Sequence, residues 1–190
     1  MISWSIHLAT MEDYREVVSC FASSSEALPA NSRMEEERAD DLLQRLSEDI
    51  KDHHVLVIKL RKTVLGFAII ARSMEDEFFP KTRSYRKTSD ILEDAGHRGE
   101  PLLILRALFV LPAYQRQGLG DELLKSLFAT YKGATWLLFL EEENQSAMTF
   151  FKAHGFFPCG NPGSLEWGEK KKAILAKRYR PTGLCREAYW

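Results

Sequence analysis

The residues with the clearest chemical meaning form a short turn that joins an apolar run to a helical segment. The turn consists of Gln115, Arg116, Gln117, Gly118, Leu119 and Gly120. Its two glycines remove side chains where a ligand would approach the backbone. The helix that follows presents N–H groups without intrahelical partners at the positive end of its dipole. A diphosphate fits such a nest of amides, although the same pattern is also typical of a purely structural turn.

The cysteines and histidines are not arranged as metal ligands. Cys20, Cys159 and Cys185 lie far apart in the sequence, and none of them forms a CxxC or Cys/His pair. His53 and His54 adjoin an apolar run, with no carboxylate or cysteine at ligand spacing. We therefore expect no metal site. An odd number of separated cysteines also favours a reducing, cytosolic compartment.

Composition and charge exclude several classes of function. The chain has 190 residues, 45% of them hydrophobic, and a formal net charge of −1. This size allows one sizeable core, and the balanced charge gives no general attraction for a nucleic acid. No apolar run approaches the roughly 20 residues that cross a bilayer, and the N-terminus lacks the pattern of a signal peptide. We expect a cytoplasmic protein that binds neither nucleic acid nor membrane.

The elements that must position the turn follow from apolar periodicity. Strands are predicted at 2–8, 54–60, 64–71, 102–110 and 135–140, and two closing strands at 156–167 and 171–180. Helices are predicted after the N-cap residues Thr10 and Ser32, after the turn, and from Asn144 to about 154. Residues 73–100 carry mixed charge, one proline and two glycines, and are interpreted as an excursion.

This order predicts an α/β fold in which helices cover both faces of a mixed central sheet. The whole chain, 1–190, is predicted to be a single domain, with the excursion at 73–100 between its third and fourth strands. Such an architecture names no chemistry by itself.

Two segments carry a resemblance to a known family. LFVLPAYQRQGLGDELL (108–124) resembles the motif of the GNAT superfamily in which a strand leads through (Q/R)xxGx(G/A) into a helix. ENQSAMTFFKAHGFF (143–157) resembles the family's next motif, a helix preceded by asparagine and closed by glycine and an aromatic residue. With the hairpin and the closing strands, the resemblance covers the chain outside 73–100. It implies a GNAT-like fold and an N-acetyltransferase that uses acetyl-CoA.

The resemblance also implies where the cofactor lies. The pantetheine arm is expected to pair with strand backbone near Phe109 and Val110, in the manner of an added strand. The diphosphate is expected on the amides of 115–120, and Asn144 would contact the pantetheine or simply cap its helix. Phe151 would pack along the cofactor. The acceptor implied is a small-molecule or peptide amine, and the resemblance leaves a homodimer open.

The sequence departs from the family at both positions that usually handle protons. Where many relatives have a tyrosine that protonates the leaving thiolate, this chain has Phe151, which has no proton to give. Where some have a glutamate base, it has Ile104. Arg106 is a charge in an apolar run, so it either faces a polar cavity and binds an acidic group of the acceptor, or forms a structural ion pair.

The remaining catalytic candidates are Glu141, at the end of a predicted strand, and Tyr85 and His97, in the excursion. Each can instead be an ordinary surface residue. The leading hypothesis is direct attack of a primary amine on acetyl-CoA in a ternary complex, because positioning and backbone oxyanion donors can supply most of the acceleration. The alternatives are a non-catalytic acyl-CoA-binding sensor, which the departures at Phe151 and Ile104 favour, and a purely structural domain.

Overall fold

The computed structural model of the chain describes residues 4–26, 36–72, 93, 95–97, 99–159, 165–167 and 170–178. Within these ranges eight strands form one sheet in the order β1-β2-β3-β4-β5-β8-β6, and β7 pairs with β8. The strands are β1 Ser5–Leu8, β2 Val55–Leu60, β3 Thr63–Ala71, β4 Leu102–Val110, β5 Thr135–Glu141, β6 Phe157–Cys159, β7 Leu165–Trp167 and β8 Lys170–Lys177. The pair β4–β5 is parallel and the other pairs are antiparallel.

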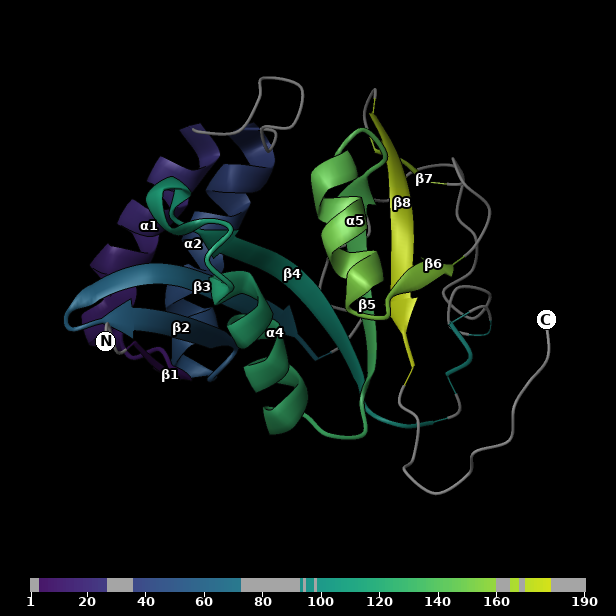
Figure 1. Cartoon of the computed structure of the whole chain (residues 1–190), viewed down its shortest axis with the longest axis horizontal. Helices are drawn as coiled ribbons and strands as arrows, with labels where there is room; N and C mark the ends of the chain where they lie inside the picture. The colour runs from purple at the N-terminus through teal and green to yellow at the C-terminus, as the bar shows by residue number, and fades with distance from the viewer. Residues whose placement is uncertain are drawn as a thin grey trace.

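Helices cover both faces of this sheet, as the sequence predicts (Figure 1). One face carries α1 and α2, and the other carries α4 and α5. The helices are α1 Tyr14–Glu26, α2 Glu36–Lys51, α4 Leu119–Thr130 and α5 Gln145–Ala153, with 3-10 turns η1 Met11–Asp13 and η3 Pro112–Tyr114. Because α4 links the parallel strands β4 and β5, its first turn lies just beyond the end of β4.

Two apolar cores lie on opposite faces of the sheet and reflect the alternation of its strands. On β4, Leu103 and Leu105 belong to the cluster under α4 and α5. On β3, Phe67 and Ile69 belong to the cluster under α1 and α2. Strands buried on both faces read as continuous apolar runs, which explains why β3, β4 and β5 were identifiable from sequence.

The predicted start of the first helix is confirmed in detail. The Thr10 backbone N–H donates to Asp13 Oδ2 at 2.9 Å, as a capping box requires. The predicted cap at Ser32 lies outside the described residues. The first hairpin turn is shorter than the predicted triplet, because Thr63 already belongs to β3 and only Arg61 and Lys62 connect the strands.

The closing part of the chain differs from the sequence prediction. Three strands are formed where two were predicted, because residues 165–167 pair with β8 beyond the point where β6 ends. Most of the excursion at 73–100 lies outside the described residues. Its last part packs on the sheet, since Ala95 is fully buried beside Ile104, and the Ala95 carbonyl accepts a hydrogen bond from Arg178 Nε at 2.7 Å.

β4 loses one of its two neighbouring strands halfway along its length. It pairs with β5 only from Leu102↔Thr135 to Leu105↔Leu138, and the two strands then diverge (Figure 1). Its pairing with β3 shifts at the same place, since Ile69 faces Ala107 while Ile70 faces Leu105. Arg106 is therefore the extra residue of a β-bulge, which bends a strand and increases its twist.

None of the helices in the described ranges combines the length and the apolar character that a bilayer span needs.

The close approach of β3 to the end of β4 can be tested by a substitution at Gly66. A Cβ at Gly66 would lie 2.7 Å from the Phe109 carbonyl oxygen, a backbone atom that cannot rotate away. We expect Gly66→Ala to lower the free energy of unfolding by about 1–3 kcal/mol, because the strands must separate. Urea denaturation measures this, with Thr63→Ala at the exposed start of β3 as control. Equal stability of the two variants would contradict the close approach.

Candidate functional site

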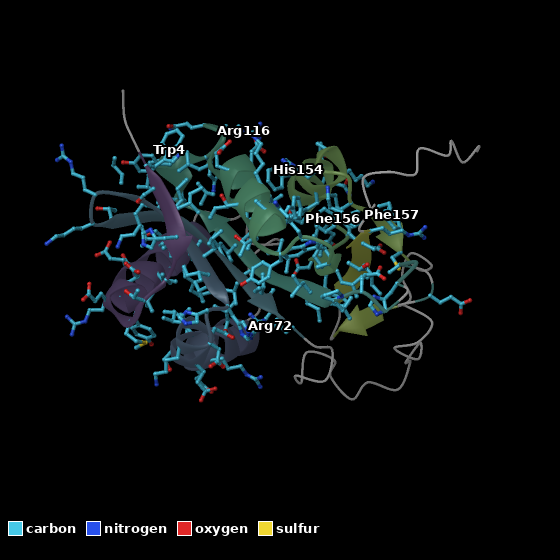
Figure 2. The ribbon with its side chains drawn as sticks, turned by 90° about the horizontal axis from the view of Figure 1, so that it is seen from below. Trp4, Arg72, Arg116, His154, Phe156 and Phe157 are labelled. Carbon is cyan, nitrogen blue, oxygen red and sulfur yellow. The ribbon has the colours of Figure 1, made fainter. Side chains whose placement is uncertain are left out.

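The turn before α4 contains residues in the left-handed backbone conformation, which is common in anion-binding turns. Arg116 has φ 58° and Gly118 has φ 86°, so two left-handed residues alternate within four positions. Successive N–H groups in such turns point into a common concavity. Arg116 is not glycine, so its left-handed conformation is uncommon and must be held by its surroundings. Figure 2 shows Arg116 on the side of the sheet that carries α4 and α5.

Two glutamine side chains hold this conformation. Gln115 Nε2 donates to the Val110 carbonyl and Gln117 Nε2 donates to the Ala113 carbonyl, each at 3.0 Å. Both side chains thus fold back onto the segment that precedes them. Their backbone amides are the groups that the sequence assigns to a diphosphate, and that assignment stays a prediction.

The first turn of α4 offers further backbone donors. The Glu122 N–H donates to the Gly118 carbonyl at 3.0 Å, which is the first bond of the helix. The N–H groups of Leu119, Gly120 and Asp121 therefore precede the helical ladder. Gly118, the N-cap, supplies no side-chain hydrogen bond. The positive end of this helix dipole is available to an anionic group.

The two glycines of the turn have different roles. A Cβ at Gly118 would meet nothing within 4 Å, so this residue faces open space, as expected for a ligand-facing position. A Cβ at Gly120 would lie 3.2 Å from Phe150 Cζ. Gly120 thus lets α4 and α5 approach each other, a packing role that the sequence interpretation did not foresee.

The backbone of β4 beyond the bulge presents alternate residues to the two sides. The Leu111 N–H donates to the Leu65 carbonyl of β3 at 2.8 Å. By alternation the backbone of Phe109 also faces β3, whereas the backbones of Leu108 and Val110 face the side that β5 has left. Of the two residues predicted to pair with pantetheine, Val110 is the one whose backbone faces this side, and the pairing of either residue stays a prediction.

Phe109 instead contributes its side chain to the core under α1. Its ring lies edge-on to Phe21, with 5.2 Å between the ring centroids, and stacks on Phe67, with 5.4 Å between the centroids. The Val110 carbonyl, besides its bond from Gln115, lies 3.4 Å from the hydroxyl of buried Ser24 on α1. The end of β4 is thus held from both α1 and the turn.

Helix α5 carries the two other predicted cofactor residues. Asn144 Oδ1 accepts the Ala147 N–H at 3.1 Å, so Asn144 is the N-cap that the sequence offered as its alternative role. Phe151 is buried in the core under α4 and α5, where its ring lies edge-on to Phe150 and Phe156. Contact of either residue with a cofactor stays a prediction.

A contact between two side chains joins the start of α4 to the end of α5. His154 Nε2 lies 2.9 Å from Asp121 Oδ1, and His154 Nδ1 lies 2.8 Å from the Phe150 carbonyl oxygen. Both ring nitrogens of His154 therefore face oxygen atoms of neighbouring residues. Figure 2 shows His154 on the same side of the sheet as Arg116.

Arg106 forms the structural ion pair that the sequence left open. Its Nη1 lies 3.0 Å from both carboxylate oxygens of Asp49 on α2, and both side chains are buried. Burial raises the pKa of the Asp49 carboxyl, and the neighbouring Arg106 guanidinium opposes that rise. The alternative role, binding of an acidic acceptor group by Arg106, stays a prediction.

The structure describes two of the three candidates for proton transfer. Glu141 ends β5, in register with Lys172 of β8. His97 Nδ1 lies 3.9 Å from Glu100 Oε1, and Tyr85 lies outside the described residues. Burial raises the pKa of the Cys20 thiol to about 11, so Cys20 is not a ready nucleophile. Among the residues that the structure describes, no His, Cys, Asp and Glu gather as metal ligands.

Sequence reasoning missed Asp49 and Phe150. A signal for Asp49 was present, because it lies three residues after Leu46, on the apolar stripe of α2. One buried acid on a helix and one buried base on a strand predict each other, since each would be costly alone. Phe150 carries no comparable signal, because an aromatic residue in an amphipathic helix has many possible neighbours.

A family model describes the middle of the chain. The model, an Acetyltransferase (GNAT) domain, matches residues 51–158, which include both quoted motifs. No curated protein matches the chain.

Solved structures share the fold over nearly the whole chain. PaiA N-acetyltransferase from Thermoplasma acidophilum, solved with coenzyme A, is 17% identical with a TM-score of 0.64, over 93% of this chain and 99% of that one. The ribosomal-protein-S18-alanine N-acetyltransferase from Escherichia coli is 18% identical with a TM-score of 0.62, over 98% and 100%. An acetyltransferase of the GNAT family from Bacillus cereus ATCC 10987 is 15% identical with a TM-score of 0.64, over 94% and 99%. At these identities the likeness shows the fold alone.

The contact between Gly120 and Phe150 can be tested by a double-mutant cycle. We expect Gly120→Val to lower the free energy of unfolding by about 1–3 kcal/mol, because the new side chain collides with the Phe150 ring. In a Phe150→Ala background the same change should cost clearly less, since the ring is gone. Chemical denaturation of the four proteins measures the coupling, and additive effects would show that the helices do not depend on this contact.

Proposed function

Since the chain belongs to the GNAT acetyltransferase family, we propose that it is an N-acetyltransferase, which moves the acetyl group of acetyl-CoA to a primary amine. The amine attacks directly in a ternary complex. The observation that carries this proposal is the divergence of β4 from β5 after Leu105, next to the uncapped start of α4. Backbone donors and acceptors on β4 and an anion nest then stand in sequence along one path.

The cofactor assignment follows that path. The diphosphate binds the amides of 115–120, where the left-handed residues Arg116 and Gly118 open the turn. The pantetheine arm pairs with the edge of β4 at Leu108 and at the Val110 N–H, in the manner of an added strand, since the Val110 carbonyl already accepts from Gln115. The coenzyme A complex of the Thermoplasma acidophilum protein supports this choice of cofactor.

Catalysis rests on position more than on a dedicated acid. The thioester is already activated, and holding the amine against it supplies much of the acceleration. We assign polarisation of the thioester carbonyl to backbone amides of β4 at the bulge, where the strand leaves β5. Glu141, at the end of β5, is our candidate for accepting the proton of the amine.

Direct attack is favoured over a covalent acyl-enzyme. A covalent route needs an activated nucleophile, and both cysteines in the described part of the chain are buried. The raised pKa of Cys20 keeps its thiol protonated near neutral pH. For the acceptor we retain the broad class of small-molecule or peptide amines, and for the compartment the cytoplasm.

A second candidate function is a non-catalytic sensor of acyl-CoA. The observation that favours it is Phe151, a buried ring without a hydroxyl at the position where many relatives have an acid. Such a protein would bind the cofactor through the same turn and strand edge without transferring the acetyl group.

Turnover with a panel of amines separates the two functions. We expect release of free coenzyme A thiol from acetyl-CoA that depends on the amine, with no burst of thiol when the amine is omitted. The panel includes small primary amines, amino acids and peptides with free N-termini. Tight binding of acetyl-CoA with no acceptor-dependent release would support the sensor instead.

A matched pair of substitutions at Gly118 tests the diphosphate site. Asn and Asp are similar in size and both tolerate the left-handed backbone, so Gly118→Asn and Gly118→Asp differ mainly in charge. We expect Gly118→Asp to weaken coenzyme A binding by about tenfold or more relative to Gly118→Asn, because its carboxylate repels the diphosphate. Calorimetric titration measures both affinities. Equal affinities would remove the diphosphate from this turn.

A further inference from the structure

The bulge of β4 decides which backbone groups face the transfer site. Before the bulge, Leu103 and Leu105 face α4 and α5. After it, Ala107 lies in the core under α1 and α2, and Leu108 packs toward α4 and α5. A regular strand would place these last two residues on the opposite faces, since a slip of one residue inverts the alternation. The N–H and C=O groups of Leu108 and Val110 point toward the diverging side only in the bulged register.

An ion pair links the bulge residue of β4 to helix α2. Arg106 Nη1 contacts both oxygens of Asp49 at 3.0 Å. Asp49 lies near the end of α2, and its carbonyl accepts the N–H of His54 at 2.8 Å. The His54 carbonyl in turn accepts the N–H of Ile70, at 3.0 Å, on the β3 side of the bulge. The Arg106 side chain is thus directed toward α2, and the same end of α2 is joined to β3 through the backbone of His54.

We propose that the buried ion pair of Asp49 and Arg106 is a positioning pair that fixes the β4 bulge, and with it the strand edge that binds and orients the acyl donor. The proposal rests on the proposed function for its effect on catalysis, and on the geometry alone for its effect on the strand. Neither side chain is a catalytic residue.

Electrostatics explains how the pair selects the register. The core under α4 and α5 is lined by apolar side chains, where a guanidinium would lose its solvation without compensation. On the other face the Asp49 carboxylate compensates the charge. Arg106 therefore stays on the α2 side, which excludes a register in which the extra residue comes earlier in β4 and Arg106 turns toward α4 and α5. The contact with Asp49 then holds the bulge residue itself.

Stability and positioning can be separated by replacing the whole pair. Removing one partner leaves a buried charge and is strongly destabilising, whereas replacing both partners by apolar residues of similar volume is often neutral or stabilising. We expect Arg106→Met to lower the urea midpoint, and Asp49→Leu combined with Arg106→Met to restore it. The double variant then keeps a stable fold without the polar tether.

The double variant carries the decisive measurement. We expect its kcat/KM for acetyl-CoA to fall by about tenfold or more although its stability is normal, because a small misplacement of a binding strand is costly. Its amide hydrogen exchange over 102–111 should also be faster than in the parent. Arg106→Lys with Asp49 unchanged should show a smaller fall in kcat/KM and slower exchange over 102–111 than the double variant. The reason is that a single nitrogen of Arg106 makes the contact with both oxygens of Asp49.

A second ion pair, in which one partner is buried, provides the control. Lys59 of β2 pairs with buried Asp13 of η1, and neither residue lies on β4. Lys59→Met combined with Asp13→Asn should change stability while kcat/KM per folded molecule and exchange over 102–111 stay within about twofold of the parent.

The outcomes distinguish this proposal from the proposed function. A stable Asp49→Leu, Arg106→Met variant with parental kcat/KM and parental exchange over 102–111 would overturn the positioning role. If the parent binds coenzyme A without turnover, its affinity for coenzyme A replaces kcat/KM as the readout. A parent that does not bind coenzyme A would refute the proposed function, and hydrogen exchange over 102–111 would still decide whether the pair fixes the strand.

Discussion

The site depends on one constraint: β4 must pair with β5 over its first half and leave it over its second half. A strand paired throughout would use its N–H and C=O groups in the ladder and leave none for a ligand. A strand unpaired throughout would leave buried polar groups without partners, at a cost of about 1–3 kcal/mol each. Here pairing with β5 ends at Leu105, while β3 continues to pair as far as Val110. The strand stays anchored on one side and becomes available on the other.

Contacts around the turn hold its backbone in one conformation without a ligand. Gly120 allows α4 to approach α5, and the contact between Asp121 and His154 joins the same two helices. Gln115 connects the turn to the end of β4. An anion site formed from backbone amides gains affinity when those amides need no reorganisation on binding. The side chains that matter most here thus act on the main chain rather than on the ligand.

The fold was predictable because its signals are local, whereas the site needed contacts between distant residues. Periodicity and capping identified the helices and the five strands up to β5, and two motifs identified the family. β6 and β7 were predicted as one closing strand, 156–167, because periodicity does not show that a stretch rich in glycine and proline divides it. The role of Gly120 depends on Phe150 in another helix, and the bulge at Arg106 depends on Asp49, 57 residues away. Spacing along the chain does not encode such meetings, although two buried opposite charges hint at one of them.

The lack of a hydroxyl at Phe151 agrees with the packing role of this side chain. Its ring fills the core between the sheet and the two helices that hold the turn, in edge-on contact with Phe150 and Phe156. A tyrosine there would need a hydrogen-bond partner or a path to solvent for its hydroxyl. The chain therefore uses this position for packing that supports the backbone site. Expulsion of a thiolate needs less help from an acid than expulsion of an amine or alkoxide, whose conjugate acids are far weaker. Acyl transfer from a thioester can therefore proceed without a general acid at this position.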